Sequence, residues 1–307
     1  MMPRGNGPPR EIAHRHVSDR YENLRQMSDG PARPPLVLIH AMGGRLSGSY
    51  VPLVSRLSGE RPVYLILYPR LGDQAAPLTR VEDMAEHYVD ILDVLGPGPL
   101  HLCGWSLGGA IAYEMAQIRE RRRKPAGFLA LIDSWLGLHK QHDQPRPAEA
   151  QRIASYLFWS YVMKLTGGAI EGAADPAHGF WQLDDSQKRE RVETAALAAA
   201  PDLFPQRGSR AFSDAFTMFA NLWNAGENYK PRRSTQPFVY FASSVADPAV
   251  VRFWLDLNDS ARCVESKGNH DTMMDIAYAA SMAKVMRLEM RRHDEAADSA
   301  ENLQARV

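Results

Sequence analysis

The chain contains short apolar runs that are separated by segments with helical periodicity. Each run is nearly continuous in apolar character, a pattern that is typical of strands buried on both faces of a parallel sheet. The runs span residues 36–40, 63–68, 100–105, 128–133, 238–243 and 261–266. Their alternation with helices predicts an α/β domain in which a mainly parallel central sheet is flanked by helices.

Helical patterns fill the intervals between these runs. Apolar residues at helical spacing predict a helix over residues 81–95, and Thr79 and Glu82 have the spacing of a capping box at its start. Gly96 is expected to end this helix. A long terminal helix is predicted after His270.

One long segment interrupts the alternation of strands and helices. Between about Gly137 and Lys230 the patterns are helical and rich in aromatic residues, which indicates a helical lid inserted between two parts of the core. The predicted order is a flexible leader, a first core part, the lid, a second core part and a solvated tail, over residues 1–34, 35–136, 137–230, 231–292 and 293–307.

Composition narrows the class of protein. Lysine and arginine total 36, as do aspartate and glutamate, so the formal net charge of zero gives no reason to expect a nucleic-acid partner or an anionic membrane surface. Two cysteines provide no disulfide framework or metal set and suit a reducing cytoplasm. No apolar run approaches the roughly 20 residues that cross a bilayer, and the N-terminus lacks the apolar core of a secretory signal. We therefore expect a cytoplasmic protein without a metal or a bound cofactor.

The run at 100–105 leads into the segment Gly104-Trp105-Ser106-Leu107-Gly108, and an amphipathic pattern follows at once. In a Gly-x-Ser-x-Gly segment the serine lies on a sharp strand-to-helix turn, where larger flanking side chains would clash with the neighbouring strand and helix. The turn exposes the Ser106 hydroxyl and directs the backbone N–H of Leu107 toward a developing oxyanion. The pattern indicates a catalytic serine; the alternative is a glycine-rich turn with an inert serine.

A serine nucleophile needs a histidine base and a carboxylate that orients the histidine. In the α/β-hydrolase arrangement the acid and then the histidine follow the serine along the chain. His270 fits this order, because it lies between the last predicted strand and the last helix. Asp133 ends a buried run, where an unpaired carboxylate would be costly, and is the favoured acid. Asp247 stays open as the alternative acid, although it precedes Pro248 and could be a turn or helix-capping aspartate.

The second oxyanion donor is expected in the loop after the first predicted strand. That loop reads Ala41-Met42-Gly43-Gly44, and its glycines permit close approach of the backbone. We expect the backbone N–H of Met42 to be the donor. The alternative is that the glycines serve only to form a tight turn.

Four segments together resemble the thioesterase domains of nonribosomal peptide and polyketide synthases: PLVLIHAMGG, LHLCGWSLGGAIAYEMAQ, LALIDSW and GNHDTMM. The resemblance extends from about residue 35 to about residue 291 and departs at Ala41, where the family commonly has proline. It implies an α/β-hydrolase fold with a helical lid and a covalent acyl-serine intermediate. It also implies that the acyl chain arrives as a thioester on the phosphopantetheine of a carrier protein.

The sequence therefore predicts a serine thioesterase that releases an acyl or peptidyl chain from a synthase carrier protein, by hydrolysis or cyclisation. An acyltransferase with an external alcohol or amine acceptor and an esterase for small esters are the alternatives. A non-catalytic binding module is disfavoured, because the serine, the acid and the histidine occur in the required order. No carrier segment is evident before Pro35, so we expect either a stand-alone enzyme or a domain of a larger synthase.

Overall fold

The computed structural model describes residues 22–45, 49–71, 76–134, 158–162, 179–180, 182–199, 208 and 210–304. The chain divides into two compact units. The first unit comprises residues 1–70, 78–139 and 225–307, and the second comprises residues 71–77 and 140–224.

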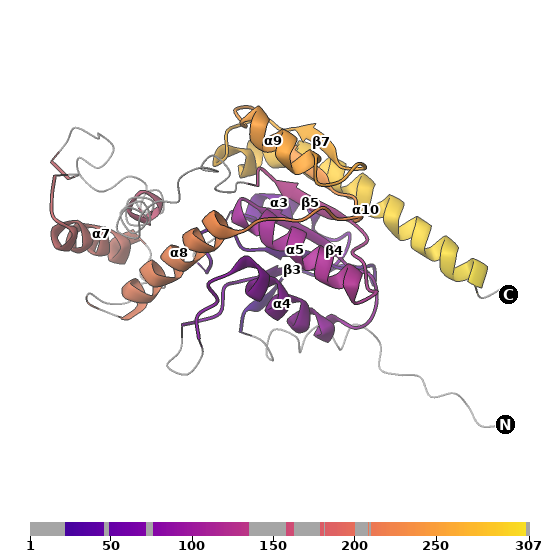
Figure 1. The fold of residues 1–307 in the computed structure, drawn as a ribbon, viewed down its shortest axis with the longest axis horizontal. Helices are drawn as coiled ribbons and strands as arrows, with labels where there is room; N and C mark the ends of the chain where they lie inside the picture. The colour runs from indigo at the N-terminus through magenta and orange to yellow at the C-terminus, as the bar shows by residue number, and fades with distance from the viewer. Residues whose placement is uncertain are drawn as a thin grey trace, which may run out of the picture. The chain divides into compact units, whose positions relative to one another are not determined.

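A seven-stranded sheet forms the centre of the first unit (Figure 1). Its strands are β1 (Leu24–Ser28), β2 (Leu36–Ile39), β3 (Val63–Ile66), β4 (His101–Trp105), β5 (Leu129–Ile132), β6 (Val239–Ala242) and β7 (Arg262–Glu265). The order across the sheet is β1-β3-β2-β4-β5-β6-β7, in which β1 is antiparallel to β3 and the other pairs are parallel. All six predicted strands and the mainly parallel sheet are confirmed, although each strand is one or two residues shorter than its apolar run.

The two edge strands differ from the sequence expectation. Patterning does not predict β1, which lies within the expected leader; only Leu24 of this strand is buried, so it has no apolar run. At the opposite edge, β7 is mostly exposed, whereas the runs were expected to be buried on both faces. An edge strand has a neighbour on one side only, which explains why neither strand needs a continuous apolar sequence.

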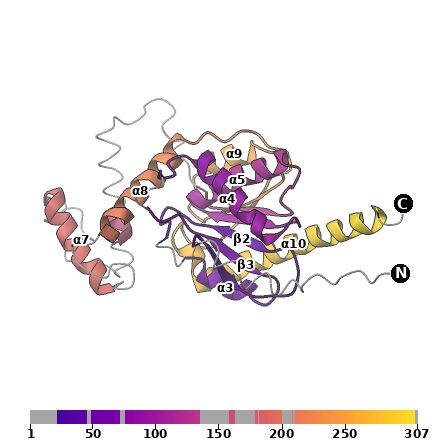
Figure 2. The same cartoon turned by 90° about the horizontal axis from the view of Figure 1, so that it is seen from below.

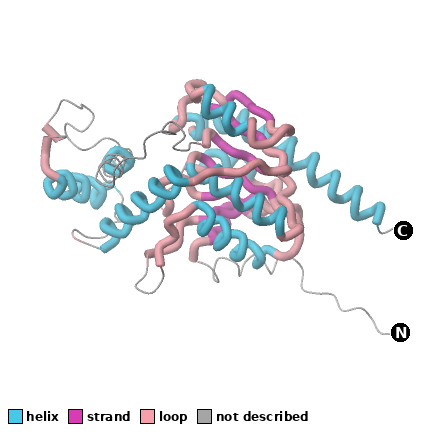
Figure 3. Tube along the Cα trace, viewed as in Figure 1, coloured by secondary structure: helices cyan, strands magenta, loops and turns pink. Residues whose placement is uncertain are grey.

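Helices cover both faces of the sheet (Figures 2 and 3). One face carries α4 (Val81–Leu92), α5 (Leu107–Arg121) and α9 (Pro248–Leu255), and the other carries α3 (Val51–Leu57) and α10 (Ile276–Gln304). The described part of this unit also contains two short 3₁₀ helices, η1 (Asp93–Leu95) and η3 (Thr272–Met274). Within the described residues, no helix is both long enough and apolar enough to cross a membrane.

A hydrophobic core fills the space between the sheet and the α3–α10 layer. Leu36 and Leu38 of β2 and Ile132 of β5 are fully buried there, together with Met282 and Met286 of α10. Burial of apolar surface contributes roughly 25 cal/mol per Å² to stability. This packing fixes the positions of the strand ends from which the candidate site residues project.

The start of α4 differs from the predicted capping box. Arg80 rather than Thr79 is the N-cap residue, and no side chain caps the helix. The acidic residues Glu82 and Asp83 lie in the first turn instead, where the positive end of the helix favours negative charge. Gly96, with φ of 92°, ends η1 as the sequence predicts.

The second unit contains α7 (Asp185–Ala199) and most of α8 (Arg210–Asn228). The described residues between 137 and 230 form helices and turns and no strand, as the patterns predict. The ring of Phe158 packs against those of Phe212, Phe216 and Phe219. These rings give the unit an aromatic core of its own, and the lid role of the segment stays a prediction.

A buried polar cluster anchors the last helix. Asp294 of α10 accepts hydrogen bonds from Arg61 Nη2 at 2.9 Å and from His101 Nε2 at 3.0 Å, and both donor side chains are only 1% exposed. Burial alone would raise the pKa of Asp294, but the hydrogen bonds from His101 and Arg61 outweigh it and lower the pKa below 3.8. The expected solvated tail from residue 293 is therefore wrong at its start, because α10 continues to Gln304 and Asp294 is bound to the core.

Replacing Asp294 with alanine is expected to lower the free energy of unfolding by about 3 kcal/mol, because Arg61 would stay buried without its anionic partner. Asp259→Ala is the matched control, since Asp259 pairs with Arg233 but is 92% exposed, and it should leave stability nearly unchanged. Urea unfolding of both variants measures the difference. Equal losses in the two variants would contradict the anchoring role of Asp294.

Candidate functional site

Ser106 lies at the junction between β4 and α5. Its backbone has φ of 59° and ψ of −129°, a conformation that residues other than glycine rarely adopt. The Ser106 amide donates to the carbonyl of Ile132 at 2.9 Å, which extends the β4–β5 ladder into the turn. Because α5 begins at Leu107, the N–H of Leu107 belongs to the first turn, whose amides have no partner within the helix.

The glycines around Ser106 are required by the close approach of neighbouring backbone. A Cβ atom on Gly104 would lie 1.9 Å from the carbonyl oxygen of Gly108, and one on Gly108 would lie 2.5 Å from the carbonyl oxygen of Ile39. Any side chain at either position would push α5 away from the strand ends. The expected clash of larger flanking residues is confirmed at both positions.

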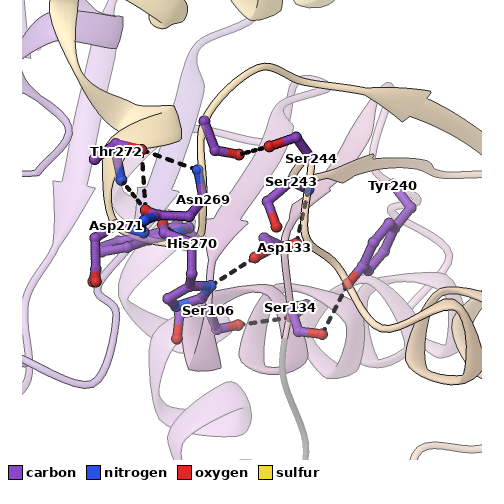
Figure 4. A network of polar contacts seen from close by, with 12 residues as sticks. Ser106, Asp133, Ser134, Tyr240, Ser243, Ser244, Asn269, His270, Asp271 and Thr272 are labelled. Carbon is purple, nitrogen blue, oxygen red and sulfur yellow. Dashed lines mark hydrogen bonds and ion pairs between the residues drawn. The ribbon is translucent and has the colours of Figure 1, made fainter.

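Asp133 and His270 meet at the carboxyl edge of the sheet (Figure 4). The Asp133 Oδ2 atom accepts a hydrogen bond from His270 Nδ1 at 2.8 Å, and its Oδ1 atom accepts one from the Ser243 amide at 2.9 Å. Burial alone would raise the pKa of Asp133, but the hydrogen bonds from His270 and Ser243 outweigh it and lower the pKa. With a proton on Nδ1, the neutral His270 ring carries its free lone pair on Nε2.

Ser106 follows β4 and His270 follows β7, so both residues, which are labelled in Figure 4, lie at the carboxyl edge of the sheet. Both residues belong to the described part of the chain, and no hydrogen bond joins the Ser106 hydroxyl to His270. Hydrogen bonds between a nucleophile and its base are often long in a free enzyme and shorten when substrate binds. The structure therefore brings Asp133 and His270 into direct contact and places Ser106 at the same edge of the sheet.

Asp247 has a different position. It is the N-cap residue of α9, and its carboxylate accepts a hydrogen bond from the Ala249 amide at 2.8 Å. This is the helix-capping role that the sequence offered as the other interpretation of Asp247. The hydrogen bond of His270 to Asp133 supports Asp133, in place of Asp247, as the acid.

Met42 lies in the turn after β2, where the Gly44 amide donates to the Ala41 carbonyl at 2.9 Å. The preceding His40 is fully buried; its Nδ1 donates to the Ala41 carbonyl at 2.9 Å, and its Nε2 accepts from the Tyr88 hydroxyl at 2.7 Å. Burial lowers the pKa of His40 to about 4, so the ring is neutral and holds the loop in place. The assignment of Met42 as an oxyanion donor stays a prediction.

Trp105 is a residue of the site to which the sequence analysis assigns no role. Its ring stacks on the His270 ring with the centroids 5.2 Å apart, and its Nε1 donates to the His270 carbonyl at 3.2 Å. One side chain thus holds both the ring and the backbone of the histidine. The only sequence signal for this role is the position of Trp105 next to Ser106.

Tyr50 supports the same region and has no signal in the sequence. Its buried hydroxyl donates to the Ile39 carbonyl at 2.8 Å and accepts from the Trp105 amide at 2.6 Å. Since β2 and β4 are paired as far as Ile39 and Gly104, Tyr50 bridges the two strands where their ladder ends. Tyr50 precedes Trp105 by 55 residues in the chain, so no motif connects them.

A hydrogen-bonded turn after β7 carries His270. The side-chain oxygen of Asn269 accepts from the amides of Asp271 at 3.1 Å and Thr272 at 2.9 Å, and Thr272 Oγ1 accepts from the Asn269 amide at 2.9 Å. The His270 side chain is 38% exposed. The turn therefore presents a partly exposed imidazole on a backbone that is fixed on both sides.

Sequence comparisons identify relatives of the chain. Residues 34–168 match the family model for a thioesterase domain. A dimodular nonribosomal peptide synthase from Bacillus subtilis is 31% identical over 271 residues, which are 84% of this chain and 10% of the synthase. A probable thioesterase, lcsE, from Purpureocillium lilacinum is 35% identical over 111 residues, which are 36% of this chain and 33% of that protein. Malpibaldin synthetase from Mortierella alpina is 38% identical over 117 residues, and these residues are 38% of this chain and 2% of the synthetase. The chain thus spans only a small part of the synthetases that it matches.

Solved structures share the fold of the chain. The NocB thioesterase domain has a TM-score of 0.57 at 19% identity, over 84% of this chain and 94% of that domain. A four-domain nonribosomal peptide synthetase has a TM-score of 0.73 at 22% identity, over 86% of this chain and 20% of that protein. These likenesses confirm the predicted α/β-hydrolase fold, and the sequence relatives confirm the predicted resemblance. Residues 34–168 therefore match the thioesterase-domain family, and the chain is similar in sequence to thioesterases and to nonribosomal peptide and polyketide synthetases.

Proposed function

We propose that this chain is a serine thioesterase that releases an acyl or peptidyl chain from the phosphopantetheine thioester of a carrier protein. The observation that supports this function most directly is the hydrogen bond between Asp133 and His270, at the sheet edge where Ser106 is the N-cap residue of α5. The relation to synthetases supports a carrier protein of a synthase as the partner.

In the first half of the proposed reaction, Ser106 Oγ attacks the thioester carbonyl carbon while His270 Nε2 takes the hydroxyl proton. Asp133 stays a carboxylate and stabilises the imidazolium that forms. The backbone N–H groups of Leu107 and Met42 are the proposed donors to the oxyanion. The carbon–sulfur bond then breaks, and His270 returns its proton to the pantetheine thiolate, which leaves an acyl ester on Ser106.

In the second half, an acceptor removes the acyl group from Ser106. For hydrolysis the acceptor is water, which gives a proton to His270 as it attacks the ester carbonyl. For cyclisation a hydroxyl or amine of the acyl chain itself attacks in the same way. Both routes restore the Ser106 hydroxyl, because His270 protonates the departing serine oxygen.

Ser106→Ala should lower kcat for an acyl-pantetheine thioester by several orders of magnitude, because the acyl-enzyme can no longer form. The change is small and lies on a turn, so the melting temperature should stay close to that of the wild type. Release of the pantetheine thiol, followed with a thiol reagent, measures the rate. Activity near the wild-type value would show that another residue is the nucleophile.

The leaving group separates the thioesterase from the plain esterase. The wild-type protein should cleave an acyl-pantetheine thioester faster than the p-nitrophenyl ester of the same acyl chain. A comparison of kcat/KM for the two substrates provides the measurement. Faster cleavage of the oxygen ester would indicate an esterase, and transfer of the acyl group to an added alcohol or amine would indicate an acyltransferase.

Asp133→Asn should lower kcat by about 10⁴-fold, because the imidazole loses its charged partner and the control of its tautomer. Asp247→Asn is the matched control, since asparagine also caps helices well and should preserve the start of α9. The kcat of this control is expected to stay close to the wild-type value. The opposite ranking of the two variants would assign the role of the acid to Asp247.

A further inference from the structure

A second serine holds the backbone of Ser106. The hydroxyl of Ser134, which is fully buried, donates to the Ser106 carbonyl at 2.7 Å. The Gly109 amide donates to the same carbonyl at 3.0 Å. Figure 4 shows the contact, in which Ser134 reaches from the end of β5 to the strained residue that follows β4.

Ser134 is itself fixed by two other elements. Its carbonyl accepts hydrogen bonds from the Tyr240 hydroxyl of β6 at 3.1 Å and from Trp254 Nε1 of α9 at 2.9 Å. Both donor side chains are buried. The hydroxyl of Ser134 therefore projects from a backbone that two buried donors hold in place.

Gly109 makes room for this hydroxyl. A Cβ atom on Gly109 would lie 2.2 Å from Ser134 Oγ and 2.8 Å from its Cβ atom. Alanine is a much better helix former than glycine, so glycine at this position of α5 needs a specific reason. The hydroxyl of Ser134 provides it, and the two residues fit each other across the junction of α5 and β5.

The same turn holds the proposed acid. Asp133 has φ of 42°, and Ser134 is the next residue along the chain. The turn after β5 thus contacts His270 through the carboxylate of Asp133 and contacts Ser106 through the hydroxyl of Ser134. A strained backbone persists only where its surroundings determine it from several directions.

We propose that Ser134 is a positioning residue for the nucleophile, and this inference rests on the proposed function of Ser106. Its hydroxyl holds the Ser106 carbonyl, and it thereby keeps Oγ directed toward the substrate and the Leu107 N–H directed toward the oxyanion. Without this donor, the Ser106 carbonyl loses one of the two hydrogen bonds described here and keeps that from Gly109. The turn then relaxes toward a less strained geometry, in which the nucleophile is poorly aimed.

Ser134→Ala tests the proposal, because it removes the donor and leaves the Cβ atom in place. We expect kcat to fall about tenfold with an unchanged KM, as a lost hydrogen bond of ordinary strength would produce. The rate at which a fluorophosphonate probe labels Ser106 should fall by a similar factor. The labelling endpoint counts the active sites, so the rates refer to folded protein even if part of the variant is unfolded.

Ser281→Ala is the matched control. Ser281 also donates its hydroxyl to a backbone carbonyl, that of Tyr278 at 2.9 Å, but on the exposed surface of α10. Both rates should equal those of the wild type in this control. A Ser134→Ala protein that melts at a lower temperature but keeps the wild-type kcat and labelling rate would overturn the proposal, since Ser134 would then serve stability alone. Failure of the wild-type protein to react with the probe would instead contradict the proposed function.

Discussion

The left-handed backbone of Ser106 is the constraint on which the carboxyl edge of the sheet depends. Such a conformation is unfavourable for a residue with a side chain, so the surrounding structure has to impose it. Gly104 and Gly108 allow α5 to approach the strands closely enough, and the carbonyls of Ile132 and Ser106 take up the hydrogen bonds of the turn. The same geometry places the start of α5 and the Ser106 side chain at the carboxyl end of β4.

Much of the first unit could be predicted from the sequence, because the inner strands of its sheet are buried on both faces and form continuous apolar runs. Residues at the ends of those runs could be predicted as well. Asp133 ends the run of β5, and His270 follows that of β7, so the parallel order of the strands alone brings both to the carboxyl edge. The hydrogen bond between them is the kind of contact that this order implies.

The features that the sequence does not reveal depend on contacts between distant segments. Tyr50 and Trp105 meet through a hydrogen bond although 55 residues separate them, and no motif connects the two. Asp294 lies in a stretch of charged residues that resembles a solvated tail, yet its carboxylate is bound to Arg61 and His101. The strand β1 is short and mostly polar, and its pairing with β3 alone makes it part of the sheet.

Helix α10 extends along the sheet from the carboxyl ends of the strands to their amino ends. It begins shortly after the turn that carries His270 at the carboxyl edge, and Asp294 binds Arg61 and His101, which lie at the amino edge where β3 and β4 begin. A mechanical pull on the residues after Asp294 would therefore act first on this buried cluster. These buried hydrogen bonds lie between the C-terminal part of α10 and the turn that carries His270, so they would have to break before the pull reached that turn through the helix.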